Sequence, residues 1–277
     1  MRVDRPRLVA SDLDGTILRQ DGTVSSRTAA ALARVERAGA RLLFLTGRPP
    51  RHTAEVLVPI GYRGTVICAN GALVYDLGRA TVVGQHLIPA PVLAEAAGRL
   101  RRAIPGIGIC VEYAESMARD AVFQPSGWDG SEPSPPQGDA QLLARDAAKL
   151  LGRHPELSAD ELLALAAPAI GDIVTVCHSN GPRLIEAMAA GVSKGSALAS
   201  VAGRFGIAAR DVVAFGDMVN DLPMLAWAGT SYGVANAHPD VLAVVDQVIA
   251  SNDEDGVAAA IEGLFPNPRP LPAAGQR

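Results

Sequence analysis

Short apolar runs of strand length recur near both ends of the chain, and each leads into a polar or glycine-containing segment. The runs LVAS, LLFL, TVIC and VVAF end at or just before Asp12, Thr46, Asn70 and Gly216. Runs of four to eight apolar residues bounded by turn-forming residues are typical of buried strands. The pattern therefore predicts at least four strands that are covered on both faces.

Segments of helical period separate these runs. Two clear examples are 28–38 (TAAALARVERA) and 196–205 (SALASVAGRF). Strands that alternate with helices predict an α/β fold with a parallel sheet between two helical layers. In such sheets ligands bind beyond the carboxyl ends of the strands, so the candidate site residues are Asp12, Thr46, Asn70 and Asp217.

The middle of the chain has a different pattern, with less regular alternation and a Gly/Pro/Ser-rich loop, QPSGWDGSEPSPPQGD. Features that suggest chemistry flank this segment and are scarce within it, so we expect an inserted α+β domain at 84–189. The core domain then comprises 1–83 and 190–265. The tail 266–277 contains four prolines, and we expect it to be disordered.

Composition excludes several classes of protein. Hydrophobic residues make up 48% and charged residues 19% of the 277 positions, as in a globular protein, and the formal net charge of −4 argues against a nucleic-acid partner. No apolar run is long enough to span a membrane. Cys68, Cys110 and Cys177 are isolated within apolar runs, so we expect reduced thiols and a cytoplasmic location.

The strongest candidate for chemistry is the segment Asp12-Leu13-Asp14-Gly15-Thr16, directly after the first run. Two aspartates at i and i+2 in extended chain point to the same side, and a glycine then permits a sharp turn. Carboxylates this close repel each other and need a cation, a shared proton or solvent. A Mg²⁺ site fits this requirement, and a solvated turn is the structural alternative.

A second acidic group, Phe215-Gly216-Asp217-Met218-Val219-Asn220-Asp221, follows the VVAF run. The i, i+4 spacing of Asp217 and Asp221 would place both carboxylates on one face of a helix, where they could complete a metal site. Asn220 could donate a hydrogen bond to a substrate or a loop. Capping of a helix by Asp217 or Asn220 remains the structural alternative.

Two further segments offer groups that could hold an oxyanion. Thr46-Gly47-Arg48 supplies a hydroxyl, a backbone N–H and a guanidinium, and Lys194 in GVSKG supplies a compact cation. Neither segment is specific alone, because most lysines are solvated. The five histidines are scattered without ligand spacing, and Asn236 lies in a turn-like segment, so we expect structural roles for all six; the histidines are His52, His86, His154, His178 and His238.

Taken in chain order, DxDGT, TGR, the lysine and GDxxND resemble the four motifs of the haloacid dehalogenase superfamily. The insertion after the third strand resembles the C2-type cap of its Cof-like subclass IIB phosphatases. The resemblance implies a Rossmann-like α/β/α core with a parallel sheet, an inserted α+β cap and a Mg²⁺ cofactor. It also implies phosphate-monoester hydrolysis of a small metabolite.

The resemblance also implies roles for individual residues. Asp12 would be the nucleophile that forms an aspartyl-phosphate, and Asp14 the general acid and base. Metal ligands would be Asp12, the Asp14 carbonyl and Asp217, with help from Asp221. The substrate phosphate would be held by five residues, which are Thr46, Gly47, Arg48, Lys194 and Asn220.

Two alternatives stay open from sequence. A phosphotransferase or sugar phosphomutase of the same fold would pass the phosphoryl group to a sugar hydroxyl, and a non-catalytic binding protein would keep the fold without turnover. The residues of the expected cap carry no readable motif, so neither the physiological substrate nor the oligomeric state can be predicted.

Overall fold

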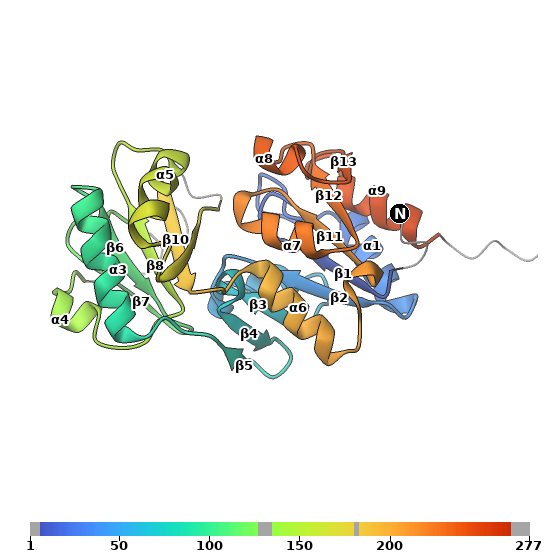
Figure 1. Cartoon of the computed structure of the whole chain (residues 1–277). Coiled ribbons are helices and arrows are strands. Elements are labelled where there is room, and N and C mark those ends of the chain that lie inside the picture. The colour runs from blue at the N-terminus through green and yellow to red at the C-terminus, as the bar shows by residue number, and fades with distance from the viewer. Residues whose placement is uncertain (1–5, 127–134, 180–182, 267–277) are drawn as a thin grey trace, which may run out of the picture.

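The computed structural model describes residues 6–126, 135–179 and 183–266, and it contains two lobes that each have their own sheet (Figure 1). The predicted disorder of 266–277 concerns residues that, apart from Pro266, lie outside the described part. Half of the predicted Gly/Pro/Ser-rich loop also lies outside it. No helix among the described residues is long and apolar enough to cross a membrane.

The larger lobe is built on an eight-stranded sheet in the order β13-β12-β11-β1-β2-β3-β4-β5. Pairing is parallel from β13 to β3, and β4 and β5 extend the sheet as antiparallel strands. The predicted α/β core is thus confirmed, with an antiparallel edge that the apolar runs did not indicate. The strands are β1 (Leu8–Ser11), β2 (Arg41–Leu45), β3 (Thr65–Cys68), β4 (Leu73–Asp76), β5 (Thr81–Gln85), β11 (Val212–Gly216), β12 (Thr230–Val234) and β13 (Gln247–Ile249).

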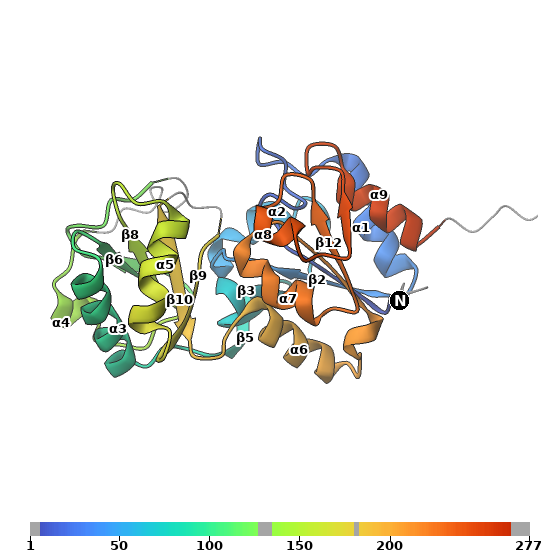
Figure 2. The same ribbon diagram turned by 45° about the horizontal axis from the view of Figure 1, so that its top comes forward.

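Helices cover both faces of this sheet (Figures 1 and 2). One pair packs α1 (Ser26–Arg37) against α9 (Gly256–Leu264), and the other packs α6 (Lys194–Arg204) against α7 (Leu222–Trp227). The central strand β1 is fully buried between these layers, as its continuous apolar run predicts. Shorter helices and 3₁₀ turns lie in the loops: η1 (Pro50–His52), α2 (Ala54–Leu57), η2 (Ala69–Gly71), η4 (Ala209–Asp211), η5 (Val219–Asp221) and α8 (Pro239–Leu242).

The smaller lobe is an antiparallel sheet in the order β7-β6-β8-β10-β9, with α3 and α5 packed side by side over it (Figure 2). Its elements are β6 (Gly108–Glu112), β7 (Met117–Arg119), β8 (Lys149–Arg153), β9 (Val174–Cys177), β10 (Leu184–Ala189), α3 (Ala90–Ala103), α4 (Asp139–Leu142) and α5 (Ala159–Ile170). This lobe has a separate apolar core. The prediction of an inserted domain with α+β architecture is therefore confirmed.

The chain passes between the two sheets twice. It leaves the core sheet after Gln85, the last residue of β5, and it returns after Ala189, the last residue of β10. The expected first boundary between residues 83 and 84 falls inside β5. We therefore propose 86–189 as the extent of the inserted domain, two residues shorter than the sequence suggested.

Both predicted helices exist, but each begins earlier than its apolar period indicates. Ser25 caps α1 by accepting a hydrogen bond from the Thr28 amide, and Ser193 caps α6 in a reciprocal pair with Ser196. A side chain that accepts a bond from the first helical turn satisfies an otherwise unpaired amide. As a result α6 starts at Lys194, which places that lysine at the helix end nearest the core sheet's carboxyl edge.

The close packing of α6 on α7 predicts a contrast between two glycines of α6. A Cβ at Gly195 would lie 2.4 Å from the Pro223 carbonyl oxygen, whereas a Cβ at Gly203 would meet nothing within 4 Å. We expect Gly195→Ala to lower the free energy of unfolding by about 1–3 kcal/mol through overpacking. Gly203→Ala, the matched control, should leave it unchanged or raise it by about 0.5 kcal/mol. Urea unfolding of both variants measures the difference, and equal stabilities would contradict the packing argument.

Candidate active site

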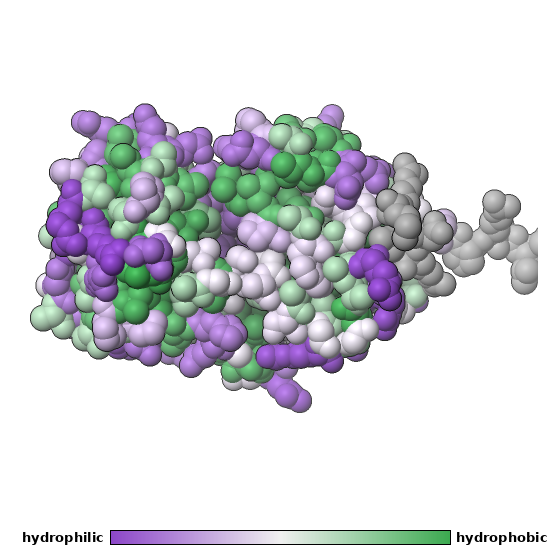
Figure 3. Space-filling view, viewed as in Figure 1, coloured by the Kyte–Doolittle hydropathy of each residue, from purple (hydrophilic) through white to green (hydrophobic). Residues whose placement is uncertain are grey.

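A cavity of about 690 Å³ lies between the two lobes, at the carboxyl ends of β1, β2 and β11. The space-filling view shows an indentation between the lobes on one face (Figure 3). The core contributes acidic and amide side chains to the cavity wall, and the cap contributes Ser126, Arg153, Ser179 and Glu186. The cavity is therefore lined by residues of both expected domains.

Asp12 occupies the end of β1, where its backbone N–H donates to the Phe215 carbonyl of β11 at 3.0 Å. Its carboxylate Oδ1 accepts a hydrogen bond of 2.5 Å from the Lys194 ammonium, which is itself buried. The same ammonium donates to Asp221 Oδ1 at 2.6 Å. One lysine thus joins two carboxylates that come from different strand ends.

The loop after β11 is held by Asp221. Its second oxygen, Oδ2, accepts hydrogen bonds from the backbone amides of Asp217 and Met218, each at 3.0 Å. A Cβ at Gly216 would lie 2.7 Å from the Cβ of Asp221, so a glycine is needed for this close approach. Asp217 in turn accepts the Thr16 hydroxyl at 2.8 Å. The loop therefore directs Asp217 toward Asp12.

Burial perturbs the ionisation of this cluster. It raises the pKa of Asp12 to about 7, because the opposing attraction of Lys194 is weaker than burial together with repulsion from Asp221 and Asp14. Burial and the Asp12 and Asp221 charges also raise the pKa of Asp217 well above its usual range. For Lys194, burial alone would lower the pKa, but Asp12 and Asp221 raise it overall. Lys194 is therefore charged, and its single positive charge does not balance the negative charges of the neighbouring carboxylates.

The donor set fits a divalent cation. Oxygens of Asp12, Asp217 and Asp221 lie within 4.8 Å of one another and face a single ammonium. With all three acids ionised, the cluster carries two uncompensated negative charges, the charge of one divalent ion. Among the described residues, Oδ2 of Asp12 and Oδ2 of Asp217 accept no hydrogen bond. Hard carboxylate oxygens are the ligands that Mg²⁺ and Ca²⁺ prefer.

Asp14 lies apart from this acidic cluster. Arg48 donates two hydrogen bonds to its carboxylate, of 2.8 Å to Oδ2 and 2.6 Å to Oδ1. Arg48 also contacts Glu55 at 3.2 Å. We expected the Arg48 guanidinium to face an oxyanion, but in the structure it is bonded to Asp14, the proposed acid–base residue. Both residues line the cavity.

Thr46 and Gly47 follow β2 and shape the floor beside Asp12. The Thr46 hydroxyl accepts the Arg48 amide at 3.0 Å, which fixes the turn. Ala69 and Asn70 have left-handed backbone angles, and their amides donate to the carbonyls of Arg48 and Thr46. Non-glycine residues rarely adopt this conformation, and it is enriched at functional sites.

A buried network of polar side chains joins the segment after β2 to the cap. The residues that the cap contributes, Lys149 and Glu186, were not predicted from the sequence. Lys149 of β8 donates to the Gly47 carbonyl at 2.7 Å and to Glu186 of β10 at 3.2 Å. Glu186 accepts from Asn70, whose Oδ1 accepts from Asn220 at 3.0 Å. Lys149 and Glu186 stand in apolar strand patterns, and no spacing in the sequence links them to the core.

We expected Asn220 to donate a hydrogen bond to a substrate or to a loop. Its amide nitrogen is used within the network, while its buried Oδ1 has no hydrogen-bond partner among the described residues. Asn236 braces two loops, donating to the Gly15 carbonyl at 2.8 Å and accepting the Asn252 amide at 3.0 Å. Its expected structural role agrees with these contacts.

Residues 9–261 match the family model described as haloacid dehalogenase-like hydrolase. The HMP-PP phosphatase of Cronobacter sakazakii is 29% identical over 86% of this chain and 87% of its own length. A 5-amino-6-(5-phospho-D-ribitylamino)uracil phosphatase of Bacillus subtilis is 24% identical, over 94% of this chain and 98% of its own. Among solved structures, a phosphatase from Bacteroides thetaiotaomicron superimposes with a TM-score of 0.79 at 22% identity, covering 94% of this chain and 96% of that one.

An acid-lined site beyond the carboxyl ends of a parallel sheet, beneath an inserted cap, is the arrangement of a phosphoryl-transfer hydrolase. The chain belongs to the haloacid dehalogenase-like hydrolase family. The resemblance to this family and the prediction of a phosphatase are confirmed. The roles of individual site residues and the identity of the metal remain predictions.

The raised pKa of Asp12 predicts how a metal should bind. Below pH 7 the protonated form of Asp12 predominates and its proton competes with a cation, so the apparent Mg²⁺ affinity should increase by at least about 50-fold in total from pH 5 to 7. The increase should level off once Asp12 and Asp217 are both ionised. Calorimetric titration of the full chain with Mg²⁺ at several pH values measures this, and an affinity that is constant from pH 5 to 7 would refute it.

Proposed function

We propose that this phosphatase hydrolyses the phosphate monoester of a small metabolite through an aspartyl-phosphate on Asp12. The observation that carries the proposal is the position of the Asp12 carboxylate. It is held by Lys194 beside Asp217 at the wall of the 690 Å³ cavity, with Oδ2 accepting no hydrogen bond from a described residue. A carboxylate nucleophile divides one difficult displacement into two easier ones.

Asp14 is the proposed general acid and base. It would protonate the leaving alkoxide and then remove a proton from the hydrolytic water. The side chain is 36% exposed at the cavity, so it can reach both groups, and the Arg48 fork fixes its orientation. The environments of the two carboxylates differ, since Asp12 is paired with a buried ammonium and Asp14 with a partly exposed guanidinium.

Mg²⁺ is the proposed cofactor. Asp12, Asp217 and the Asp14 carbonyl would hold it, and Asp221 would act through the loop that it braces, because its oxygens already accept three hydrogen bonds. When bound, the ion would screen the negative charges of the phosphoryl group and the carboxylates.

The remaining candidates are proposed to position the phosphate. Lys194 would neutralise a phosphoryl oxygen while it holds Asp12, and Thr46 and Gly47 would offer donors beside it. Arg48 is proposed to act through Asp14, and Asn220 through its link to Asn70. This assignment changes the expected direct phosphate contact of Arg48 into a positioning role.

Small phosphorylated metabolites are the proposed substrates. A volume of about 690 Å³ lies within the usual range of small-molecule sites, and the cap closes one side of it. The relatives named above act on small phosphorylated compounds. Leaving-group contacts are assigned to the cap residues Arg153, Ser126 and Glu186. A cytoplasmic location stays an expectation.

Replacing the nucleophile tests the mechanism. Asp12→Asn keeps the side-chain volume but removes the attacking charge, so hydrolysis of an aryl phosphate should fall by about 10⁴-fold or more. The matched control is Asp211→Asn, the same change at the opposite edge of the core sheet, and it should retain activity. Steady-state assays with Mg²⁺ and circular dichroism distinguish loss of chemistry from loss of fold, and a folded Asp12→Asn variant with substantial activity would exclude the nucleophile.

Product analysis separates a hydrolase from a transferase of the same fold. A panel of sugar phosphates and other small phosphate esters should release inorganic phosphate in stoichiometric amounts without an added acceptor. Removal of metal with EDTA should abolish this release, and Mg²⁺ should restore it. Transfer of phosphate to an added sugar, without release to water, would favour the phosphotransferase. Binding of phosphate esters without any turnover would favour the non-catalytic protein.

A further inference from the structure

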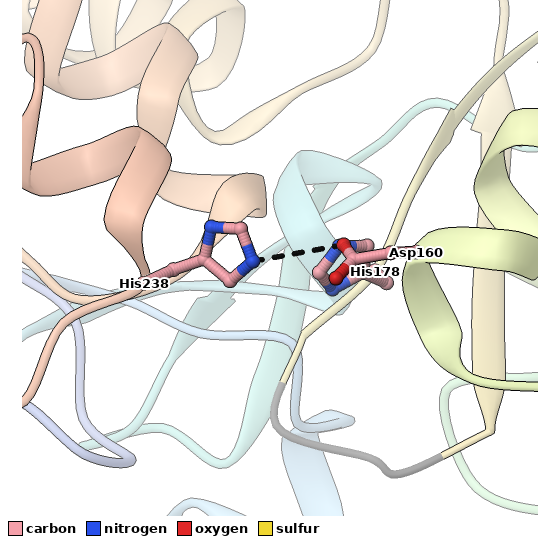
Figure 4. Close-up of side chains that lie close together, drawn as sticks. All are labelled: Asp160, His178 and His238. Atoms are coloured by element: carbon pink, nitrogen blue, oxygen red, sulfur yellow. Dashed lines mark hydrogen bonds and ion pairs between the residues drawn. The ribbon is translucent and has the colours of Figure 1, made fainter.

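A second cluster of metal-ligating side chains lies across the lobe interface, outside the acidic cluster just described. It consists of Asp160, His178 and His238. Asp160 is the second residue of α5 and His178 directly follows β9, so both belong to the cap, while His238 precedes α8 of the core. Figure 4 shows the three side chains converging from these separate elements.

The distances suit a shared ligand. Nε2 of His178 lies 2.9 Å from Asp160 Oδ1, and Nε2 of His238 lies 3.6 Å from the same oxygen. The two imidazole rings are 5.6 Å apart between centroids, edge to face. In a tetrahedral zinc site, with bonds of about 2.0–2.2 Å, ligand atoms are roughly 3.3–3.5 Å apart. The two histidine–aspartate separations bracket this value, and all three ligand atoms lie within 4.8 Å of one another.

We propose that Asp160, His178 and His238 form a binding site for a transition-metal dication such as Zn²⁺, which joins the cap to the core. Two imidazole nitrogens and one carboxylate favour zinc over magnesium, because imidazole is a ligand of borderline-soft metals. Three protein ligands leave a fourth position for water or another donor. The donor chemistry therefore differs from that of the all-oxygen cluster around Asp12.

Ligation of a metal through Nε2 would place the N–H of each imidazole at Nδ1. Metal-bound imidazole commonly donates its second N–H to a carboxylate or carbonyl, which fixes the tautomer. Nδ1 of His238 lies 3.8 Å from the Asp240 carboxylate, within reach of a small ring rotation that would replace its present bond from the Asp240 amide. His178 is 2% exposed, and its Nδ1 has no hydrogen-bond partner among the described residues. No second contact therefore commits His178 to one tautomer.

Local structural roles account for only part of this arrangement. Asp160 is favourable in the first turn of α5, and His238 caps α8 through Nδ1. Neither role requires that Nε2 of two histidines from different lobes point at one carboxylate oxygen. The Asp160 side chain is 67% exposed, so an ion can enter from solvent.

The site would restrain the cap. Because two ligands move with the cap and one with the core, an ion bound by all three would oppose separation of the lobes. His238 is also tied to the acidic loop, since its backbone N–H donates to the Asp217 carbonyl at 2.7 Å. A bound dication would therefore hold the cap in its present position beside the cavity and slow the exchange of substrate and product.

Zinc titration of the full chain in excess Mg²⁺ tests the site, because excess Mg²⁺ would compete with zinc for the all-oxygen cluster. We expect one Zn²⁺ per chain, and a strong visible absorption when Co²⁺ is used as the probe, as in four-coordinate sites with nitrogen ligands. Asp160→Asn, His178→Gln and His238→Gln should each weaken zinc binding by roughly 100-fold or more. His86→Gln, at an exposed histidine outside the cluster, should bind zinc as the unmodified chain does.

Asp160→Asn is the variant that disturbs the fold least, because it keeps the volume of a side chain that is 67% exposed. Its phosphatase activity in Mg²⁺ should be unchanged, while Zn²⁺ should inhibit only chains that keep all three ligands. An absence of zinc binding in excess Mg²⁺, or equal zinc affinity in all three variants, would overturn the proposal. The binding assay requires no turnover, so it can fail or succeed independently of the proposed hydrolysis.

Discussion

The structure depends on one buried ammonium. Lys194 lies at the start of a helix, where a cation is disfavoured by the helix dipole, yet it holds carboxylates from two separate strand ends. Removing one member of a buried ionic group leaves the others uncompensated, typically at a cost of about 3–5 kcal/mol. The register of β1 beside β11, the tight loop after Gly216 and the packing of α6 on α7 all serve to bring these groups together.

Much of the core and its acidic cluster could be predicted, because the acidic residues directly follow the apolar runs that form the strands. Asp12 and Asp217 directly follow buried apolar runs, and parallel strands end at the same edge, so their proximity follows from the fold. The partner of Arg48 could not be inferred, because a guanidinium suits a phosphate and a carboxylate equally well. The antiparallel strand β5 was missed because its burial alternates, and the chain crosses into the cap at its end.

The side-chain contacts of the cap could not be predicted, for a different reason. Lys149 and Glu186 lie on neighbouring antiparallel strands and contact each other, and their remaining partners, Gly47 and Asn70, belong to the other lobe, so only tertiary structure reveals the network. His178 and His238 are 60 positions apart and lack any ligand spacing, which led to the expectation of unrelated roles. Their meeting around Asp160 shows that an interface can assemble a donor set that no motif encodes. The two clusters differ in donor type, hard oxygen in one and mixed nitrogen and oxygen in the other.

The second crossing between the lobes is very short. Only residues 190–193 separate the cap strand that carries Glu186 from Lys194, and a Cβ at Gly71 would already lie 2.4 Å from the Ser193 carbonyl oxygen. An inserted domain attached so closely cannot be exchanged as a free module. In the diversification of such enzymes, cap sequences could vary widely, whereas an insertion or deletion at this junction would displace Lys194 from its contacts with Asp12 and Asp221. The length of four linking residues is thus a constraint on evolution and on any chimera made by grafting a new cap.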